Sequence, residues 1–526
     1  MMVETWVIVN TNTRSKNSSS VDTRSGADVP GFMDSPRARR SRCQRRATRV
    51  REPQAASARR ARALSFARRP PRPKSVMPGA EASAEDRDRA SPPPDGSRWA
   101  GLAIAALGGL LGGLVGGAVV LAVTVALKAM MDFVSGEATI EVIVVPLVGL
   151  ALTTLVLHGF GRTASPDLPA AGAWRTFPPD AIRADITGDV VDSAGAEERF
   201  PWRLAALRAV AIFATVGLGA ATGTEAPAAY LGVATGACLG DRGRRWRRLL
   251  RPAALAAGAA GVSAVMGVAA VGTAYMLELG RRHRAPLSPE RVIAAVIGGV
   301  VGWRLNDVLG LTLIRLIVPR EPPASVLQAV KTALFIGAIS GAITAVSGAL
   351  IYRAKKWHAS PLIRLVLGGL AVAIAAVAIV AVAVPTAAVG PGGGAILWAE
   401  NAAPVPGALL AVALLRATAT TAATAAGGCG GIFVPFLAVG DLAGRVFAPG
   451  FEIGNDLAGA AGAAAGIAGG YRLPFTAMAM SLGIGGPRQA MWTCLATVVV
   501  ASVVGPGAGA VIHRVTNRPG RSRSRP

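Results

Sequence analysis

Long apolar stretches separated by short polar segments dominate the chain from residue 99 onward. The first stretch, residues 99–127, contains no charged residue and is long enough for a helix to cross a bilayer. Further apolar blocks cover residues 140–157, 204–239, 253–277, 292–318, 326–351, 365–398, 409–447, 457–484 and 491–512. The pattern predicts an all-α, polytopic membrane protein.

Several of these blocks are interrupted by glycine or proline. The interruptions are at Gly223, Pro227, Pro385, Pro391, Gly430 and Pro435. Broken helices at bilayer depth are tolerated where their backbone lines a cavity or packs against protein. We therefore expect tilted and broken helices around a functional cavity.

An internal repeat accompanies two of the breaks. The same intervals occur in Pro227, Gly232 and Gly236 and in Pro435, Gly440 and Gly444. Matching Gly/Ala-rich segments follow at residues 261–277 and 466–482. Duplication of this kind is typical of transporters and channels whose site lies where broken helices of two inverted repeats meet. The alternative is ordinary close packing of helices through glycine every four residues.

Charge is concentrated at the ends of the chain. The net charge is +25, and much of it lies in a basic leader, residues 1–96, and a basic tail, residues 516–526. We expect the leader to be disordered and the two membrane repeats to cover residues 97–285 and 286–515. Basic ends favour the cytoplasmic side, which predicts an even number of crossings. Nucleic acid is not an expected partner, because the charged tails lack interleaved aromatic residues.

Cysteine and histidine are sparse and scattered. Cys43 lies in the leader, and Cys238, Cys429 and Cys494 lie in apolar segments, which fits neither a disulfide pattern nor a metal cluster. We expect no metal, no cofactor and no enzymatic activity.

The first candidate for chemistry is Glu225, in the run 223–227 inside a long apolar stretch. An ionisable residue at membrane depth is costly and usually belongs to a transport path. The alternatives are a helix N-cap and a buried ion pair, but no lysine or arginine lies nearby within the block.

Glycine-rich turns precede a helix in each repeat. Glycine lets backbone N–H groups converge, and the helix dipole adds positive potential, so such turns suit a small anion. The expected anion-binding residues are Gly223, Thr224, Ala226, Gly430, Gly431, Ile432 and Phe433. The alternative for the second turn is tight packing.

Gly-x-Glu-x-Pro followed by Gly-Gly-Ile-Phe-x-Pro resembles the CLC family of chloride channels and chloride/proton exchangers. Residues 200–203, 385–396 and 472–476 support the resemblance, which covers residues 99–511. It implies a homodimer with one anion pathway per subunit. It also implies that Glu225 gates by competing with anions and swings away when protonated, and that the amides of Ile432 and Phe433 bind the central anion.

The chain departs from the family pattern at the inner side of this pathway. The Gly-Ser-Gly-x-Pro motif is absent, and the best register places Thr176 at its serine, although Thr176 could equally be a loop residue. Residues 505–511 lack the pore tyrosine of the family.

The proton-relay pair of the exchangers also differs, because Glu-Glu is replaced by Glu278 and Leu279. Leucine cannot carry a proton. Glu278 could take over the proton relay, or it could form an interfacial salt bridge with Arg281 or Arg282.

The leading hypothesis is a CLC-type anion channel in the cell membrane, conducting chloride or other small anions and gated by a protonatable glutamate. The alternatives are a chloride/proton antiporter on the same fold and a non-conducting structural or regulatory protein. The expected partners are the anion, the lipid bilayer and a second copy of the chain.

Overall fold

The computed structural model describes residues 95–134, 139–160, 190, 200, 202–242, 252–282, 285–357 and 359–516. All of them belong to one compact unit, Ser91–Pro526. The described residues are helical and contain no β-strand, with one isolated β-bridge between two turns. The expected all-α class is confirmed.

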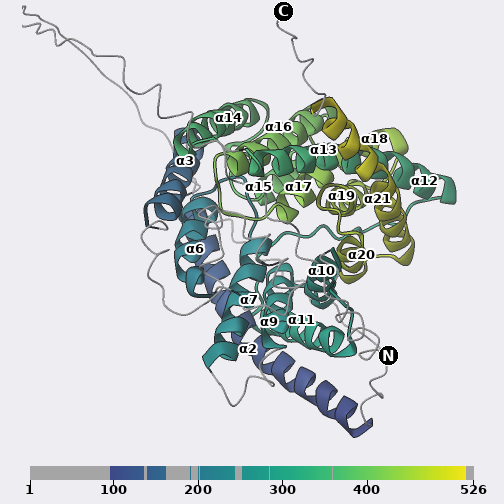
Figure 1. Ribbon diagram of the computed structural model, residues 1–526. Coiled ribbons are helices and arrows are strands. Elements are labelled where there is room, and N and C mark those ends of the chain that lie inside the picture. Colours follow the sequence, from purple (N-terminus) through teal and green to yellow (C-terminus); the bar gives the residue numbers. More distant parts are fainter. Residues whose placement is uncertain are drawn as a thin grey trace, which may run out of the picture. The chain divides into compact units, whose positions relative to one another are not determined.

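The helices from α2 to α11 come first along the described chain (Figure 1). They are α2 (Asp95–Val134), α3 (Thr139–Leu155) with η1 (Val156–Phe160), η4 (Trp202–Leu204), α6 (Ala205–Ile212), η5 (Phe213–Gly217), α7 (Glu225–Arg242), α9 (Ala253–Met266), α10 (Ala269–Arg282) and α11 (Pro289–Leu309).

The second half follows an extended segment after α11. Its helices are α12 (Val326–Lys331), η7 (Thr332–Ile336), α13 (Gly337–Lys355), α14 (Pro361–Val382), η8 (Pro385–Ala387), α15 (Gly393–Asn401), α16 (Pro406–Ala425), α17 (Phe433–Arg445), α18 (Ala448–Phe451), α19 (Asn455–Gly466), η9 (Ile467–Tyr471), α20 (Pro474–Gly483) and α21 (Arg488–Thr516).

Two helix breaks fall where the sequence predicts them, and a third falls where it does not. The block 204–239 is broken between η5 and α7, and the block 409–447 between α16 and α17. The block 253–277 is a further broken one, because Gly267 adopts a φ of +68° and ends α9. Glycine reaches this left-handed conformation without the steric cost that other residues meet.

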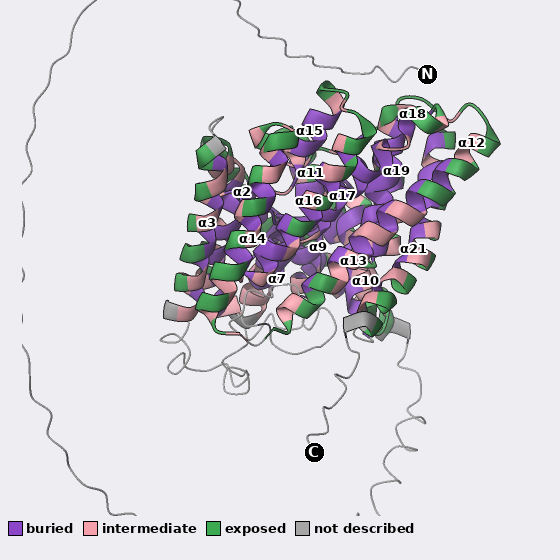
Figure 2. Ribbon diagram, turned by 90° about the horizontal axis from the view of Figure 1, so that it is seen from above, coloured by how far each residue is buried: buried purple, intermediate pink, exposed green. Residues whose placement is uncertain are grey.

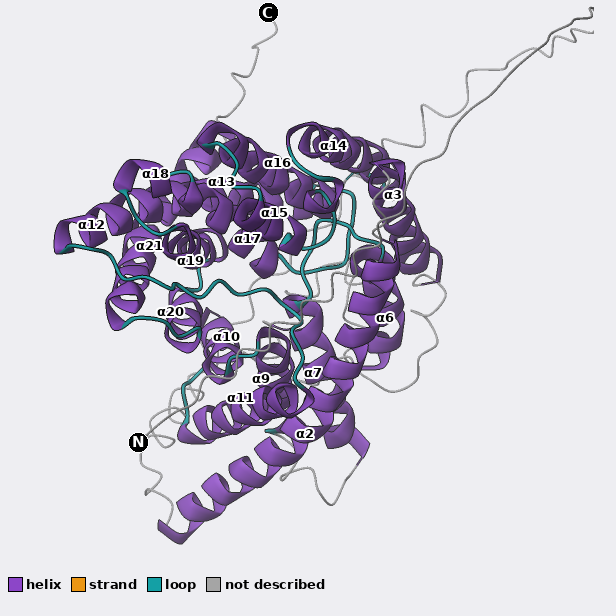
Figure 3. Cartoon of the chain, turned by 180° about the vertical axis from the view of Figure 1, so that it is seen from behind, coloured by secondary structure: helices purple, strands orange, loops and turns teal. Residues whose placement is uncertain are grey.

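Helix α9 is packed between α2, α7 and α11 (Figure 3). Each of these neighbours presents a Gly-x-x-x-Gly pair to the alanines of α9, namely Gly112 and Gly116, Gly232 and Gly236, and Gly298 and Gly302. A β-carbon on Gly302 would stand 2.0 Å from the carbonyl oxygen of Ala260. The backbones therefore approach as closely as small residues permit.

Helix α17 packs on α19 in the same way as α7 packs on α9. A β-carbon on Gly440 would stand 2.2 Å from the carbonyl oxygen of Gly462, and one on Gly444 would stand 2.2 Å from that of Ala458. The glycines of the repeated motif are thus packing residues as well as markers of a repeat. The internal repeat and the close packing of helices through glycine are therefore compatible interpretations of the pattern.

Exposed residues lie along the outer helices (Figure 2), and many of them are large and apolar. Seven helices of the described chain are long and apolar enough to cross a membrane, judged by length and composition. Helix α14 exposes Leu362, Ile363, Val366, Leu367, Leu370, Ile374 and Val377. An apolar surface of this extent fits contact with lipid, so the chain is a polytopic membrane protein.

Candidate functional site

The two glycine-rich turns meet inside the protein. Gly223 and Gly431 form an antiparallel bridge in which each N–H donates to the other residue's carbonyl oxygen at 2.8 Å. These residues are 208 positions apart in the sequence, one in each half. The bridge brings the starts of α7 and α17 to one place, as the repeat predicts.

Glu225 is fully buried at this meeting point and is the first residue of α7. Its Oε1 accepts a hydrogen bond of 2.6 Å from the N–H of Phe433, the first residue of α17. The backbone amides of Val434 and of Glu225 itself also face the carboxylate. Two helix N-termini thus direct positive potential at one negative charge. The geometry makes Glu225 a cap of the opposite helix, and among the described residues it forms no salt bridge.

Both glycines of the bridge leave room for this carboxylate. A β-carbon on Gly431 would stand 1.9 Å from Oε1 of Glu225, and one on Gly223 would stand 2.1 Å from Oε2. No other amino acid fits at either position without displacing the acid. The absence of a side chain is therefore what lets the acid reach the far helix.

The remaining expected anion ligands line the same two turns. Thr224 accepts the N–H of Ala228 at its carbonyl oxygen in the first turn of α7, beside Ala226, which is buried. Ile432 is the N-cap of α17. Gly430 packs against Thr222, where a β-carbon would stand 2.5 Å from the threonine side chain. Thr176, the expected counterpart of the pore serine, lies outside the described residues.

Further hydrogen bonds join the segments that precede the two turns. The N–H of Cys429 donates to Oγ1 of Thr215 at 2.9 Å, and Thr153 lies 2.7 Å from the same oxygen. Gly219 accepts a further backbone hydrogen bond of 2.8 Å from Gly390. The segment 385–396, which supported the family resemblance, therefore buttresses the first turn.

Buried Arg416 holds that segment in place. Its guanidinium donates to four consecutive carbonyl oxygens, those of Ala387, Ala388, Val389 and Gly390, at 2.5–3.3 Å. A buried charge is tolerated when such contacts replace water. Arg416 therefore supports the site through the segment 385–396. None of its described contacts is with the Glu225 carboxylate.

Glu278 caps a different helix of the second half. Its carboxylate accepts from the N–H groups of Phe475 and Thr476 at 3.3 and 3.0 Å and from the Thr476 hydroxyl at 2.8 Å. Arg282 donates to the carbonyl oxygens of Tyr471 and Arg472. The acid is therefore bound to the beginning of α20, across the interface between the halves.

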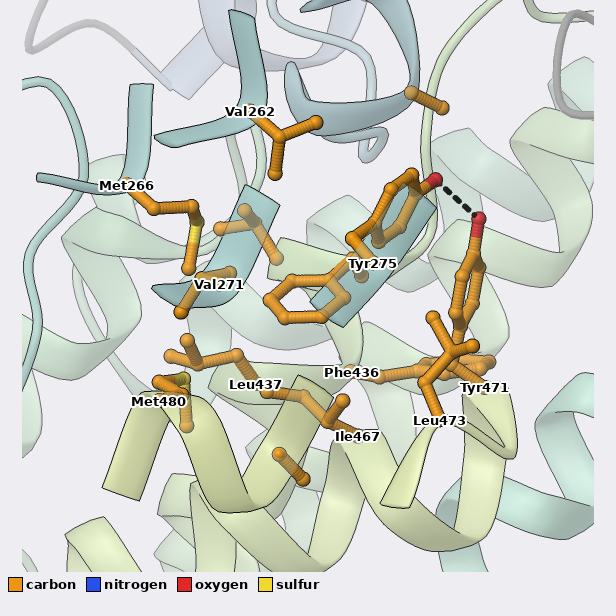
Figure 4. Packing of buried hydrophobic residues seen from close by; sticks show 14 of the residues in the cluster. Val262, Met266, Val271, Tyr275, Phe436, Leu437, Ile467, Tyr471, Leu473 and Met480 are labelled. Atoms are coloured by element: carbon orange, nitrogen blue, oxygen red, sulfur yellow. Dashed lines mark hydrogen bonds between the residues drawn. The ribbon is translucent and has the colours of Figure 1, made fainter. Parts of the chain in front are cut away.

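Two tyrosines in the same interface are absent from the sequence prediction. Figure 4 shows the hydroxyl groups of Tyr275 in α10 and Tyr471 in η9, which lie 3.0 Å apart. The ring centroid of Phe433 lies 6.2 Å from that of Tyr275 and 6.1 Å from that of Tyr471, edge-on to both. All three rings are buried. The available signal was that each tyrosine lies in one of the paired Gly/Ala-rich segments of a chain with only four tyrosines.

Comparisons with known proteins give a consistent result. The family model described as voltage gated chloride channel matches residues 168–506. No curated protein matches the chain.

Among solved structures, a slow cyanobacterial Cl⁻/H⁺ antiporter aligns with a TM-score of 0.62 and 19% identity, covering 78% of this chain and 98% of the other. A CLC-type fluoride/proton antiporter aligns at 0.56 and 19%, covering 79% and 98%, and a eukaryotic CLC transporter at 0.53 and 16%, covering 80% and 77%. At these identities the structures establish the shared fold. The family model covers most of the chain, and the chain therefore belongs to the voltage gated chloride channel (CLC) family.

Proposed function

We propose that the protein exchanges a small anion, chloride in the first instance, for protons across the membrane. The observation that carries the proposal is the hydrogen bond from the Phe433 amide to the buried Glu225 carboxylate. The solved structures with the higher TM-scores, whose titles name chloride/proton and fluoride/proton antiporters, support exchange over passive conduction.

The same helix N-terminus suits either the carboxylate or a free anion. Its amides and dipole stabilise one negative charge. While Glu225 is ionised, its side chain fills the position. Protonation removes the charge, weakens the contact with Phe433 and lets the side chain leave, so that an anion can enter. Proton uptake and anion binding are linked because one site serves both.

Passive conduction by a channel is the second candidate, and Leu279 favours it. Its side chain is buried among apolar residues and offers no group that can bind a proton. Under this alternative Glu225 still gates the pathway, but protons do not cross with each turnover.

A paired flux assay separates the candidates. Purified protein is reconstituted in vesicles, and anion and proton movements are recorded together under an imposed chloride gradient. Exchange predicts that the chloride gradient drives protons uphill, whereas a channel moves chloride alone. Parallel runs with fluoride test which anion is preferred. Absence of any anion flux from correctly folded protein would instead support a non-conducting role.

The setting of this activity is part of the same proposal. We infer a homodimer in the cell membrane with both termini in the cytoplasm. The apolar outer surface and the basic ends of the chain support this arrangement.

A further inference from the structure

We propose that the hydrogen-bonded hydroxyl groups of Tyr275 and Tyr471 carry protons between Glu225 and Glu278. The inference rests on the proposed exchange of anions for protons, and it assigns the inner part of the proton route to two residues outside the recognised motifs.

The first step is the polar stripe along α10. Tyr275, Glu278 and Arg282 are spaced i, i+3 and i+7, which places them on one face of the helix. All three contact the segment 471–476 of the second half, through the tyrosine pair, the cap of α20 and the bonds to the carbonyls of residues 471 and 472. The stripe thus faces the segment 471–476 along α10.

The second step is the position of the tyrosine pair relative to the gate. Both rings contact Phe433, whose amide holds the Glu225 carboxylate. Tyr275 is within electrostatic range of Glu225 on one side and of Arg282 on the other. Arg282 is in turn within range of Glu278 and Tyr471. The hydroxyl pair thus lies beside the residue that holds the gate and in the same interface as the Glu278 cap of α20.

Leu279 does not interrupt this route. Its side chain is buried, and the polar contacts with residues 471–476 are made by its neighbours Tyr275, Glu278 and Arg282. A proton route along the stripe therefore needs no titratable group at position 279.

The transfer leaves the tyrosines unchanged. A hydroxyl oxygen that accepts a proton from Glu225 or an intervening water releases its own proton to the partner hydroxyl. The partner does the same toward water and the Glu278 carboxylate. Each O–H bond that forms is balanced by one that breaks, and the positive charge of Arg282 remains at the carbonyl oxygens of residues 471 and 472.

The test uses Tyr275→Phe, Tyr471→Phe and the double variant in the paired flux assay. Phenylalanine keeps the ring packing and removes the hydroxyl. We expect proton flux to fall by about tenfold or more, as for loss of a positioned proton-transfer group, with anion flux changed less than about threefold. Tyr230→Phe is the matched control, because Tyr230 is also buried but its ring packs against Phe200 and Arg208 and not against Phe433.

Three outcomes would overturn the assignment. Coupled transport that is unchanged in all three variants would show that the hydroxyls carry no protons. Equal loss of anion and proton flux would make the pair a structural clamp. A wild-type protein that moves chloride without protons would remove the proposed exchange together with this route, and that result is distinguished by the wild-type measurement alone.

Discussion

Glu225 combines a charge, full burial and a reach across the interface between two helices. Burial alone would make an ionised carboxylate unstable, but the amide of Phe433 and the dipoles of two helix beginnings offset part of the hydration that it loses. This stabilisation of the Glu225 side chain depends on its negative charge. Binding of a single proton therefore removes it.

Glu225→Gln should abolish the pH dependence of anion flux. Glutamine is uncharged at every pH and competes poorly with an anion for the beginning of α17. Wild-type flux should rise as the pH falls, by at most about tenfold per pH unit because one proton is involved. Chloride efflux from vesicles at neutral and acidic pH provides the measurement. A variant that kept the wild-type pH profile would exclude Glu225 as the gate.

Gly431→Val should weaken anion binding. Its first side-chain atom would occupy the position of the Glu225 carboxylate, and its branching would force the turn. Loss of one hydrogen bond to a charged group corresponds to about tenfold in affinity. Chloride titration by calorimetry on purified protein measures it, with Gly407→Val as control because a β-carbon there meets nothing within 4 Å. Equal affinity in both variants would remove the second turn from the site.

Sequence reasoning found the residues that carry a local signal. Glu225 stands out as an acid in an apolar run, and the glycines and prolines around it recur in the second half. Tyr275 and Tyr471 carry only the weaker signal of their places in the paired Gly/Ala-rich segments, because their contact spans 196 positions and depends on how the chain packs. Glu278 was assigned two alternative roles, and its position at the beginning of α20 depends on the same packing.

At the scale of elements, the pairs α7 with α9 and α17 with α19 place the two site helices. Small residues at their contacts bring the backbones together and thereby fix where each helix begins. The position of the gate is therefore set partly by glycines that never approach it.

Gly440→Ala should destabilise the protein. The added methyl group would meet the carbonyl oxygen of Gly462 at 2.2 Å, so α17 must shift from α19. Overpacking of this kind costs about 1–3 kcal/mol. Thermal unfolding in detergent should show a lower midpoint than for Gly450→Ala, where a β-carbon meets nothing within 4 Å. An unchanged midpoint would contradict the close contact.

Element boundaries were the less predictable part of the fold. The apolar block 253–277 gave one expected span, but Gly267 divides it into α9 and α10. Gly267 turns the chain, whereas Gly258 and Gly261 remain helical in the same block. Nothing local separates these glycines, because the choice depends on the tertiary contacts of the helices that follow.

At the scale of the whole molecule, one chain supplies both halves of the described site. Glu225, Phe433 and the tyrosine pair all come from the same polypeptide. A homodimer would therefore contain two separate pathways.

Mixed dimers test this independence. Co-expression of wild-type chains with Gly431→Val chains under two affinity tags should yield heterodimers whose flux lies midway between those of the two homodimers, since each subunit works alone. Flux measurement on doubly purified protein, with wild-type homodimers bearing both tags as control, decides the point. Complete loss of flux in the heterodimer would indicate a pathway shared between subunits.

The reciprocal pairing of Gly223 with Gly431 restricts how the gate can open. Two backbone hydrogen bonds join the turns. Separating the turns would leave four buried backbone polar groups, two N–H and two C=O, without hydrogen-bond partners. Rotation about the side-chain bonds of Glu225 costs less free energy, because it leaves both hydrogen bonds between Gly223 and Gly431 intact. We therefore expect the gate to open by a change of the Glu225 side-chain rotamer alone. The helices α7 and α17 can keep their positions throughout the transport cycle.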